Sequence, residues 1–461
     1  MKLTKLIFVL CLVAMLAGNV FAGGQEEEVD SADLIYDYSQ DVLDWAAEVK
    51  EKVGGQKITI ASIEITAMDA WKKMTPDFEK LTGIDVDYYS VELSKLHDKY
   101  LLDNAGKTGL FDIMYCSKAF GYELFELGAL ESIQPWLDNT KTVTTPAWFD
   151  YDDFIPSLRY VNEDLNGDAF AFPATGECAV MGYREDLFEQ YGRDYPKTWA
   201  EVYEAAKFFN DLELERDGVR VYGIVMRGRP AFGGANFPTP LIGFNWGAKL
   251  YDYDTKEILW KSQEAVDGVS FMVDLCAQGH PQISTLSATE AIATFAEGQA
   301  AIGLEVTALM PVVENPKTSV VAGKIHYEPV PMGPANDYNT ISGAGLGMST
   351  QTKNKDAAFA FMVWMLSKAN GNIYVDNGGV IVRQSLINER KDDFPYFQAA
   401  IEGFEQAARM LEAGVDGQPK SQHTMAWTNT FAKYGSAAIA GQMTPEEAVE
   451  AMQQEFEAVT K

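Results

Sequence analysis

An alternation of short apolar segments with amphipathic segments limits the folds open to this chain more than any other feature. Residues 57–61, 84–88 and 111–115 are strand-like, and helical periodicity fills 67–82 and 91–103 between them. This order requires parallel pairing, because each helix carries the chain back along the sheet. We therefore predict an α/β protein with helices on the faces of its sheet. Ligand sites in such sheets gather at the carboxyl ends of the strands.

Helix and strand signals continue through the rest of the chain. We expect further strands at 222–226, 300–304, 325–329 and 340–350, and further helices at 263–278 and 355–368. Three capping boxes mark helix starts: Thr198 with Glu201, Ser287 with Glu290, and Thr444 with Glu447. A proline at position 76 lies inside a predicted helix and predicts a kink or a restart there.

The N-terminus has the three parts of a secretory signal peptide. Lysines stand within residues 1–5, an apolar run fills 6–16, and small residues flank Phe21 at the cleavage site. We predict that residues 1–22 are removed. Cys11 lies inside the apolar run and follows Leu10, where a lipobox needs a small residue. This disfavours a lipoprotein, and a periplasmic location is expected. Residues 23–55 follow as an acidic leader with an extra helix at 34–53.

Length, charge and cysteine content narrow the class of protein further. A chain of 461 residues is long enough for two domains. Its formal net charge of −30 argues against nucleic-acid partners and anionic membrane surfaces, because both would repel it. Three further cysteines stand in apolar contexts: Cys116, Cys178 and Cys276. They could all be buried free thiols, or two of them could form one disulfide.

The segment 170–209 is the most informative single stretch. We expect a short strand ending at Pro173, a turn at 175–177, a second strand at 178–183, and a helix that starts at Thr198. This order resembles the lobe crossover of the family 1 extracellular solute-binding proteins, the substrate-binding subunits of ABC importers. The order of the other elements extends the resemblance over residues 56–461.

The resemblance implies a two-lobe periplasmic-binding-protein fold of type II, in which each lobe is a helix-flanked sheet and a hinge joins the lobes. On this basis the first lobe comprises 56–172 and 331–369, and the second comprises 173–330 and 370–461. The implied function is capture of a sugar or polyol and delivery to an inner-membrane ABC permease. It implies no enzyme activity, no cofactor and a monomeric chain. Residues 223–230 resemble sorbitol- and mannitol-type members.

Candidate ligand-binding residues come from strand ends, the crossover and loops of the second lobe. Hydroxyl-rich ligands need hydrogen-bond partners, aromatic faces and places where the backbone can approach closely. The candidates are Glu64, Thr66, Ser117, Lys118, Thr175, Glu177, Arg227, Phe232, Asn236, Trp246, Glu305, Gly343, Gly345, Gly378 and Trp427.

Several candidates have a structural alternative. Arg227 and Glu305 fit ligand contacts and equally fit ion pairs, and Trp246 and Trp427 fit core positions as well as stacking platforms. Residues 305–307 stand where many relatives carry Gly-Pro-Trp, so the stacking tryptophan of those relatives is missing.

Two other functions stay open. A periplasmic glycan lyase or hydrolase needs two facing carboxylates, and no motif nominates such a pair. A carrier of a non-sugar solute such as iron or a polyamine would share the fold. Residues 164–168 begin like a calcium loop, but Ala169 and Thr175 replace its required Gly and Glu, so we predict a hairpin turn. We expect no metal site.

Overall fold

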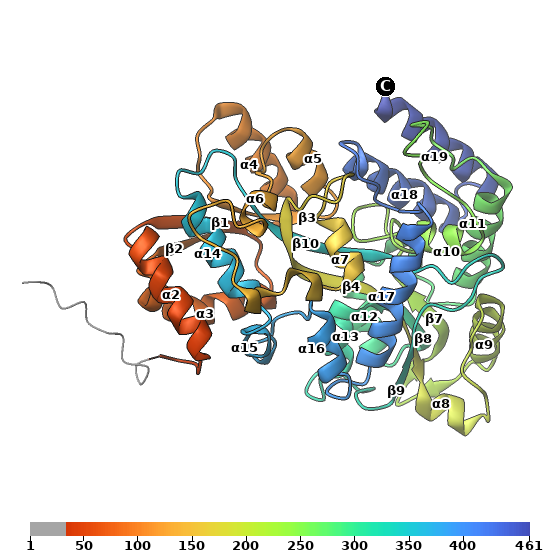
Figure 1. Cartoon of the computed structure of the whole chain (residues 1–461). Coiled ribbons are helices and arrows are strands. Elements are labelled where there is room, and N and C mark those ends of the chain that lie inside the picture. The colour runs from red at the N-terminus through yellow and green to blue at the C-terminus, as the bar shows by residue number, and fades with distance from the viewer. Residues whose placement is uncertain (1–33) are drawn as a thin grey trace, which may run out of the picture. The chain divides into compact units, whose positions relative to one another are not determined.

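One mixed sheet runs through the part of the chain that the computed structural model describes, residues 34–461 (Figure 1). Its path is β2-β1-β3-β10-β4-β8-β7, and β9 also pairs with β4. The strands are β1 Lys57–Ser62, β2 Asp85–Ser90, β3 Ile113–Ser117, β4 Ala171–Arg184, β7 Tyr222–Met226, β8 Ala300–Val306, β9 Ile325–Glu328 and β10 Ile341–Met348; β5 Glu215–Arg216 and β6 Val219–Arg220 form a separate hairpin. The predicted signal peptide lies outside the described residues.

The pairing directions divide the sheet. β1 pairs in parallel with β2 and β3, as the strand–helix alternation predicts, and β7 pairs in parallel with β8. In the middle, β10 runs antiparallel to both β3 and β4, and β4 runs antiparallel to β8. β10 and β4 therefore join two parallel groups of strands.

The crossover differs from its prediction in one respect. Residues 175–177 do not turn, because β4 continues through them from Ala171 to Arg184. The first half of β4 pairs with β10, and its second half pairs with β8 and β9. A strand that changes neighbours half-way keeps its backbone hydrogen-bonded throughout, so the polar residues Thr175 and Glu177 need no loop.

The segment before the crossover holds the hairpin turn predicted at residues 164–168, preceded by a helix. Residues Pro156–Val161 form a short helix, α7, and a tight turn follows, in which Asp164 Oδ1 accepts hydrogen bonds from the backbone N–H groups of Asn166 and Asp168. The turn itself is as predicted, with Gly167 at φ 89°.

Helices of the first group pack around β1, β2 and β3. They are α2 Gln40–Val53, α3 Thr66–Thr82, α4 Leu93–Gly106 and α14 Lys355–Leu366. α2 starts later than the predicted 34–53 and buries Trp45 and Val49 against the group, where it contacts α3 and α14. α3 runs through Pro76 as one helix, so the predicted restart does not occur.

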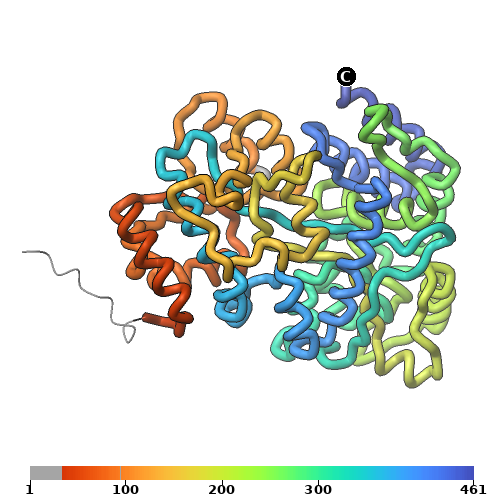
Figure 2. Tube along the Cα trace, in the orientation of Figure 1, coloured from red at the N-terminus to blue at the C-terminus, as the bar shows by residue number. Residues whose placement is uncertain are grey.

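Helices of the second group surround β7 and β8, partly in direct contact with these strands and partly packed on other helices of the group. They are α9 Trp199–Asp211, α10 Pro238–Asn245, α11 Gln263–Cys276, α12 Ala288–Ala296, α18 Thr424–Ile439 and α19 Pro445–Thr460, while α17 Phe397–Glu412 packs on β4. All three predicted capping boxes form, at the starts of α9, α12 and α19. Figure 2 shows both groups along the chain trace: residues 341–366 lie with the first hundred described residues, and the C-terminal helices lie with the middle of the chain.

Shorter helices complete the described residues: α5 Gly121–Glu126, α6 Gln134–Leu137, α8 Glu185–Gln190, α13 Met310–Val313, α15 Gly371–Asp376 and α16 Gln384–Glu389. Within residues 34–461, no helix has the length and apolar character that crossing a bilayer requires. Cys116, Cys178 and Cys276 are all buried and unpaired, which resolves the open choice in favour of free thiols.

Candidate functional site

Arg227 and Glu305 form a buried ion pair at neighbouring strand ends. Arg227 directly follows β7, and Glu305 lies on β8, its parallel neighbour. Arg227 Nε donates to Glu305 Oε1 at 2.7 Å, and Nη2 donates to Oε2, so the pair is bidentate. The side chains are 10% and 3% exposed, and the guanidinium lies 4.3 Å from the centre of the Phe237 ring. The ion-pair alternative of Arg227 and Glu305 is therefore present in the structure.

Glu177 extends this cluster across the sheet. It lies on β4 in register with Ser342 on β10, and it is only partly exposed. Burial raises the pKa of the Glu177 carboxyl, Arg227 opposes that shift, Glu305 adds to it, and a hydrogen bond from Ser342 lowers it. Glu177, Arg227, Glu305 and Ser342 are therefore close enough to act as one electrostatic unit.

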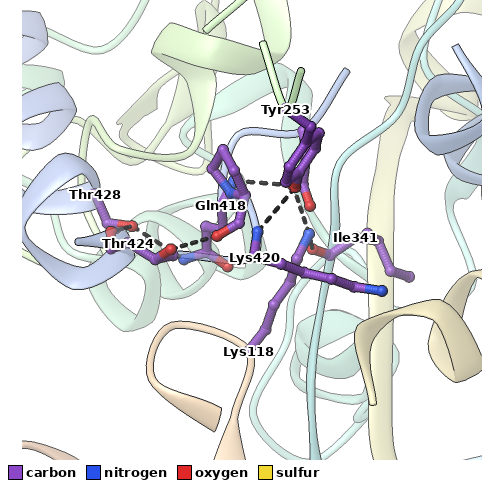
Figure 3. Close-up of polar contacts among 9 residues, drawn as sticks. Lys118, Tyr253, Ile341, Gln418, Lys420, Thr424 and Thr428 are labelled. Atoms are coloured by element: carbon purple, nitrogen blue, oxygen red, sulfur yellow. Dashed lines mark hydrogen bonds and ion pairs between the residues drawn. The ribbon is translucent and has the colours of Figure 1, made fainter. Parts of the chain in front are cut away.

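Lys118 lies at the other end of a row of polar side chains, which we call the polar row: Lys118, Ser342, Glu177, Glu305 and Arg227. It directly follows β3, and its Nζ donates to the backbone oxygen of Ile341 at 3.3 Å, next to Ser342. The same Nζ donates at 2.7 Å to Oδ1 of Asp416, in the loop between α17 and α18. The two side chains are 5% and 3% exposed. Figure 3 shows Lys118 and Ile341 meeting Tyr253 and the loop residues Gln418 and Lys420.

Lys420 and two tyrosines surround this ion pair. The Lys420 backbone N–H donates to the Tyr253 hydroxyl at 2.8 Å, and its Nζ lies 3.6 Å from the centre of the Tyr160 ring. Burial lowers the pKa of the Lys420 amine to about 8, against the opposing effect of Glu163. Burial raises the pKa of Tyr160 to about 12, and Asp416 adds to that shift.

Four further predicted residues lie in the sheet between these groups. The Thr175 hydroxyl accepts from the Ala344 backbone N–H at 3.1 Å and lies 3.2 Å from the Tyr115 hydroxyl. Ser117 pairs with Ala344 across the strands. A Cβ at Gly343 would lie 2.4 Å from the Thr175 oxygen, and one at Gly345 would lie 2.0 Å from Asn162 Oδ1. Both glycines thus serve close backbone packing, which is the structural role.

Thr66 and Gly378 line a separate cavity of about 300 Å³. Its other walls are mostly apolar and include Phe397 and Phe404, so it does not continue the polar row. Gly176, which precedes Glu177 on β4, also lines it. Glu64, predicted to belong with Thr66, is exposed to solvent and is not brought to the row.

The remaining candidates lie elsewhere. Asn236 Oδ1 accepts from the Gly234 backbone N–H at 2.9 Å and so shapes its own loop, and Phe232 accepts a hydrogen bond from Arg229 through its backbone oxygen. Trp246 packs on Phe271, with ring centres 4.4 Å apart. Trp427 is fully buried against Tyr251. Trp427 therefore occupies its core alternative, whereas Trp246 is half-buried.

Sequence reasoning missed Asp416, Lys420, Tyr160, Tyr253 and Ser342. They come from α7, β10 and two loops, and no motif links segments so far apart. Among residues 34–461, no group of three or more His, Cys, Asp or Glu side chains is arranged to hold a metal ion. The row contains both positively and negatively charged side chains, and this mixture suits a neutral, hydroxyl-bearing ligand.

The fold and the polar row at its strand ends define a solute-binding protein rather than an enzyme. A profile of the family described as bacterial extracellular solute-binding protein matches residues 62–372. The chain belongs to this family, as the crossover motif predicts.

Similar proteins include two of known ligand. The mannitol-binding protein of Pseudomonas aeruginosa is 26% identical over 332 residues, which cover 71% of this chain and 72% of the relative. The erythritol/L-threitol-binding protein of Mycolicibacterium smegmatis is 25% identical over 364 residues, covering 75% and 73%. A solute-binding protein of Agrobacterium radiobacter, solved with ribitol, superposes with a TM-score of 0.74 at 21% identity, covering 88% of this chain and 99% of that one. The chain thus has the two-lobe, helix-flanked fold of ABC-transporter binding proteins.

Proposed function

We propose that this protein captures a polyol or a related sugar between its two lobes and delivers it to the permease of an ABC importer. The row formed by Lys118, Ser342, Glu177, Glu305 and Arg227 carries the proposal. It crosses the junction between β10 and β4, where the lobes proposed from sequence, 56–172 with 331–369 and 173–330 with 370–461, adjoin. The polyol ligands of the similar proteins support the same ligand class.

The chemistry of the row matches hydroxyl groups. Each hydroxyl donates one hydrogen bond and accepts others, so a polyol needs acceptors and donors side by side. Glu177 supplies a carboxylate acceptor and Lys118 a donor, and the paired charges of Arg227 and Glu305 lie beside Glu177. Mixed signs disfavour an anionic solute, because each carboxylate would repel it.

The aromatic groups favour an open-chain ligand over a pyranose ring. A ring sugar gains stability by stacking on a flat aromatic face. Trp246 packs on Phe271 and Trp427 packs on Tyr251, so the two tryptophans expected as platforms are engaged with other rings. Linear polyols require no such floor.

Binding would act through lobe closure. A ligand that contacts both lobes favours the closed form, by no more than its preference for that form. We expect the closed form to dock on an inner-membrane permease, with the chain acting as a periplasmic monomer and without a cofactor.

Thermal unfolding against a panel of polyols, sugars, amines and metal ions tests this function. Ligand at about 100 times its Kd should stabilise the fold by about 2.7 kcal/mol. A rise in Tm with a polyol or sugar is the expected result. A rise only with a metal or an amine would overturn the proposal.

A further inference from the structure

Asp416 has one carboxylate oxygen that the protein leaves without a partner. Its Oδ1 accepts from Lys118 Nζ at 2.7 Å and from the Gln418 backbone N–H at 2.9 Å. Its Oδ2 is buried and accepts no hydrogen bond from any described residue. The side chain is 3% exposed. Buried carboxylate oxygens normally accept hydrogen bonds, so this oxygen needs an explanation.

Two other enclosed acids, Glu305 and Asp153, have partners on both carboxylate oxygens. Glu305 receives Arg227 on both oxygens and the Val306 backbone N–H on one of them. Asp153 receives the Ser385 backbone N–H on Oδ1, at 3.0 Å, and the Ser385 hydroxyl on Oδ2, at 2.8 Å. Among residues 34–461, Asp416 Oδ2 is the one buried carboxylate oxygen without a partner. A purely structural ion pair does not account for this difference.

The groups around Asp416 come from several segments. Lys118 follows β3, and Tyr253 and Lys420 lie in loops (Figure 3). Tyr160 lies on α7. Lys118 and Tyr160 fall in the proposed first lobe, whereas Tyr253, Asp416 and Lys420 fall in the second. The Lys118–Asp416 contact therefore spans the two lobes and must part when they separate. A solute entering the open cleft then reaches both side chains.

Lys118 has a donor to spare in the same place. An ammonium group carries three N–H bonds, and Lys118 uses two, toward Asp416 and the Ile341 oxygen. A free acceptor and a free donor on adjoining side chains match two neighbouring hydroxyls of one ligand. Since the pair is neutral as a whole, it suits a neutral diol better than a carboxylate or phosphate.

We propose that Asp416 is a specificity-determining ligand contact: its Oδ2 accepts a hydrogen bond from one hydroxyl of a vicinal diol, while Lys118 donates to the adjacent oxygen. This inference rests on the proposed function and adds to it the residue, the atom and the feature of the ligand that is recognised. Because Lys118 and Asp416 belong to different lobes, the same diol links recognition to closure.

Isothermal titration calorimetry with D-mannitol, ribitol and erythritol tests the inference on the wild-type chain and on Asp416→Asn. For the polyol that binds best, Asp416→Asn should weaken binding about ten- to a hundredfold, because a charged acceptor is lost. Asp153→Asn is the matched control, since it alters a largely enclosed acid, 9% exposed, that has partners on both oxygens and lies away from the row. The affinity of this variant should stay within twofold of wild type. The double variant Lys118→Met/Asp416→Asn leaves no unpaired buried charge and replaces the single variant if that one does not fold.

Monodeoxy analogues of the bound polyol separate a direct contact from a structural effect. On the wild-type chain, one analogue should bind at least tenfold more weakly than the parent polyol. On Asp416→Asn, the same analogue and the parent polyol should bind equally well. Unchanged affinity in Asp416→Asn, equal losses in Asp153→Asn, or no analogue with this coupling would overturn the inference and leave the proposed function standing. A folded wild-type chain that binds no polyol or sugar would overturn both.

Discussion

The guanidinium of Arg227 and the carboxylate of Glu305 meet in a bidentate pair where two parallel strands end, with Nε and Oε1 2.7 Å apart. Neither partner is free to hydrate, since their side chains are 10% and 3% exposed. Burial makes each charge dependent on the other. The pair thus stabilises the junction of β7 and β8 and holds two polar groups toward Glu177.

Removing one partner of the Arg227–Glu305 pair should lower the free energy of unfolding more than removing both. We expect Glu305→Ala to lower the free energy of unfolding by about 3–5 kcal/mol, because Arg227 is left buried and unpaired. Arg227→Met combined with Glu305→Leu should be less destabilising than Glu305→Ala, since no buried charge remains. Urea unfolding of the single and double variants measures both. A double variant that is less stable than Glu305→Ala would contradict this account.

Two glycines, Gly343 beside the polar row and Gly378 at the separate cavity, offer a matched test of backbone packing. Gly343 and Gly378 both have positive φ, 145° and 97°, but only Gly343 has backbone in the way of a Cβ, at 2.4 Å from the Thr175 oxygen. We expect Gly378→Ala to lower the free energy of unfolding by about 1 kcal/mol, through conformational strain alone. Gly343→Ala should lower it by about 3 kcal/mol or more, because a steric clash adds to the strain. Equal losses in urea unfolding would show that the contact with β4 is not rigid.

Lys420 should make stability depend on pH in the alkaline range. Burial lowers the pKa of its amine to about 8, so between pH 8 and about 10 the unfolded chain binds a proton that the folded chain has released. The free energy of unfolding should therefore rise with pH in that window, by at most about 1.4 kcal/mol per pH unit from this group. The charges that act on the amine are Glu163, Asp416 and Asp164, which favour protonation, and Lys118, which opposes it.

Urea unfolding from pH 7 to pH 10 checks this effect as a difference from Lys420→Met, which cancels the titration of groups common to both chains. Wild type should gain stability relative to the variant as the pH rises. Lys433→Met, at an exposed ion pair with Glu455, is the control and should follow wild type. Parallel curves for wild type and Lys420→Met would mean that the amine is not buried as described.

The three described cysteines should be unreactive in the native protein. Burial raises the pKa of Cys276 to about 12, and it raises the pKa values of Cys116 and Cys178 well above their usual range. Because the thiolate is the reactive form, Ellman's reagent should label no thiol of the folded chain from residue 23 onward. It should label three after unfolding in guanidinium without reductant. Two silent thiols in the unfolded chain would indicate a disulfide.

Local signals predicted the elements well. Each capping box of the form S/T-x-x-E starts a helix, because the reciprocal hydrogen bonds need only residues three apart. The crossover was misjudged at Thr175-Gly176-Glu177, where turn-forming residues lie in a continuous strand. The backbone hydrogen bonds of these residues are made with β10, and local sequence patterns do not reveal a strand partner so far along the chain.

The site was predictable only in part. The strand-end rule nominated Lys118, whereas Glu177 was nominated from the crossover, and Arg227 and Glu305 from the resemblance to the family. Asp416 lies in a loop with no motif, and its role depends on Lys118, 298 residues away. Trp427 is fully buried and Trp246 is half-buried, a difference that the residue type alone does not reveal in the sequence.

Calorimetric titration of the folded chain with D-mannitol, ribitol and erythritol, beside D-glucose and maltose, tests the central claim most directly. The account predicts saturable binding of at least one open-chain polyol with one site per chain, and tighter binding of that polyol than of either ring sugar. Binding of none of these solutes by a chain that unfolds cooperatively would contradict the claim that this protein captures polyols or sugars. Binding of maltose or glucose alone would keep the carbohydrate function and contradict the preference for an open chain.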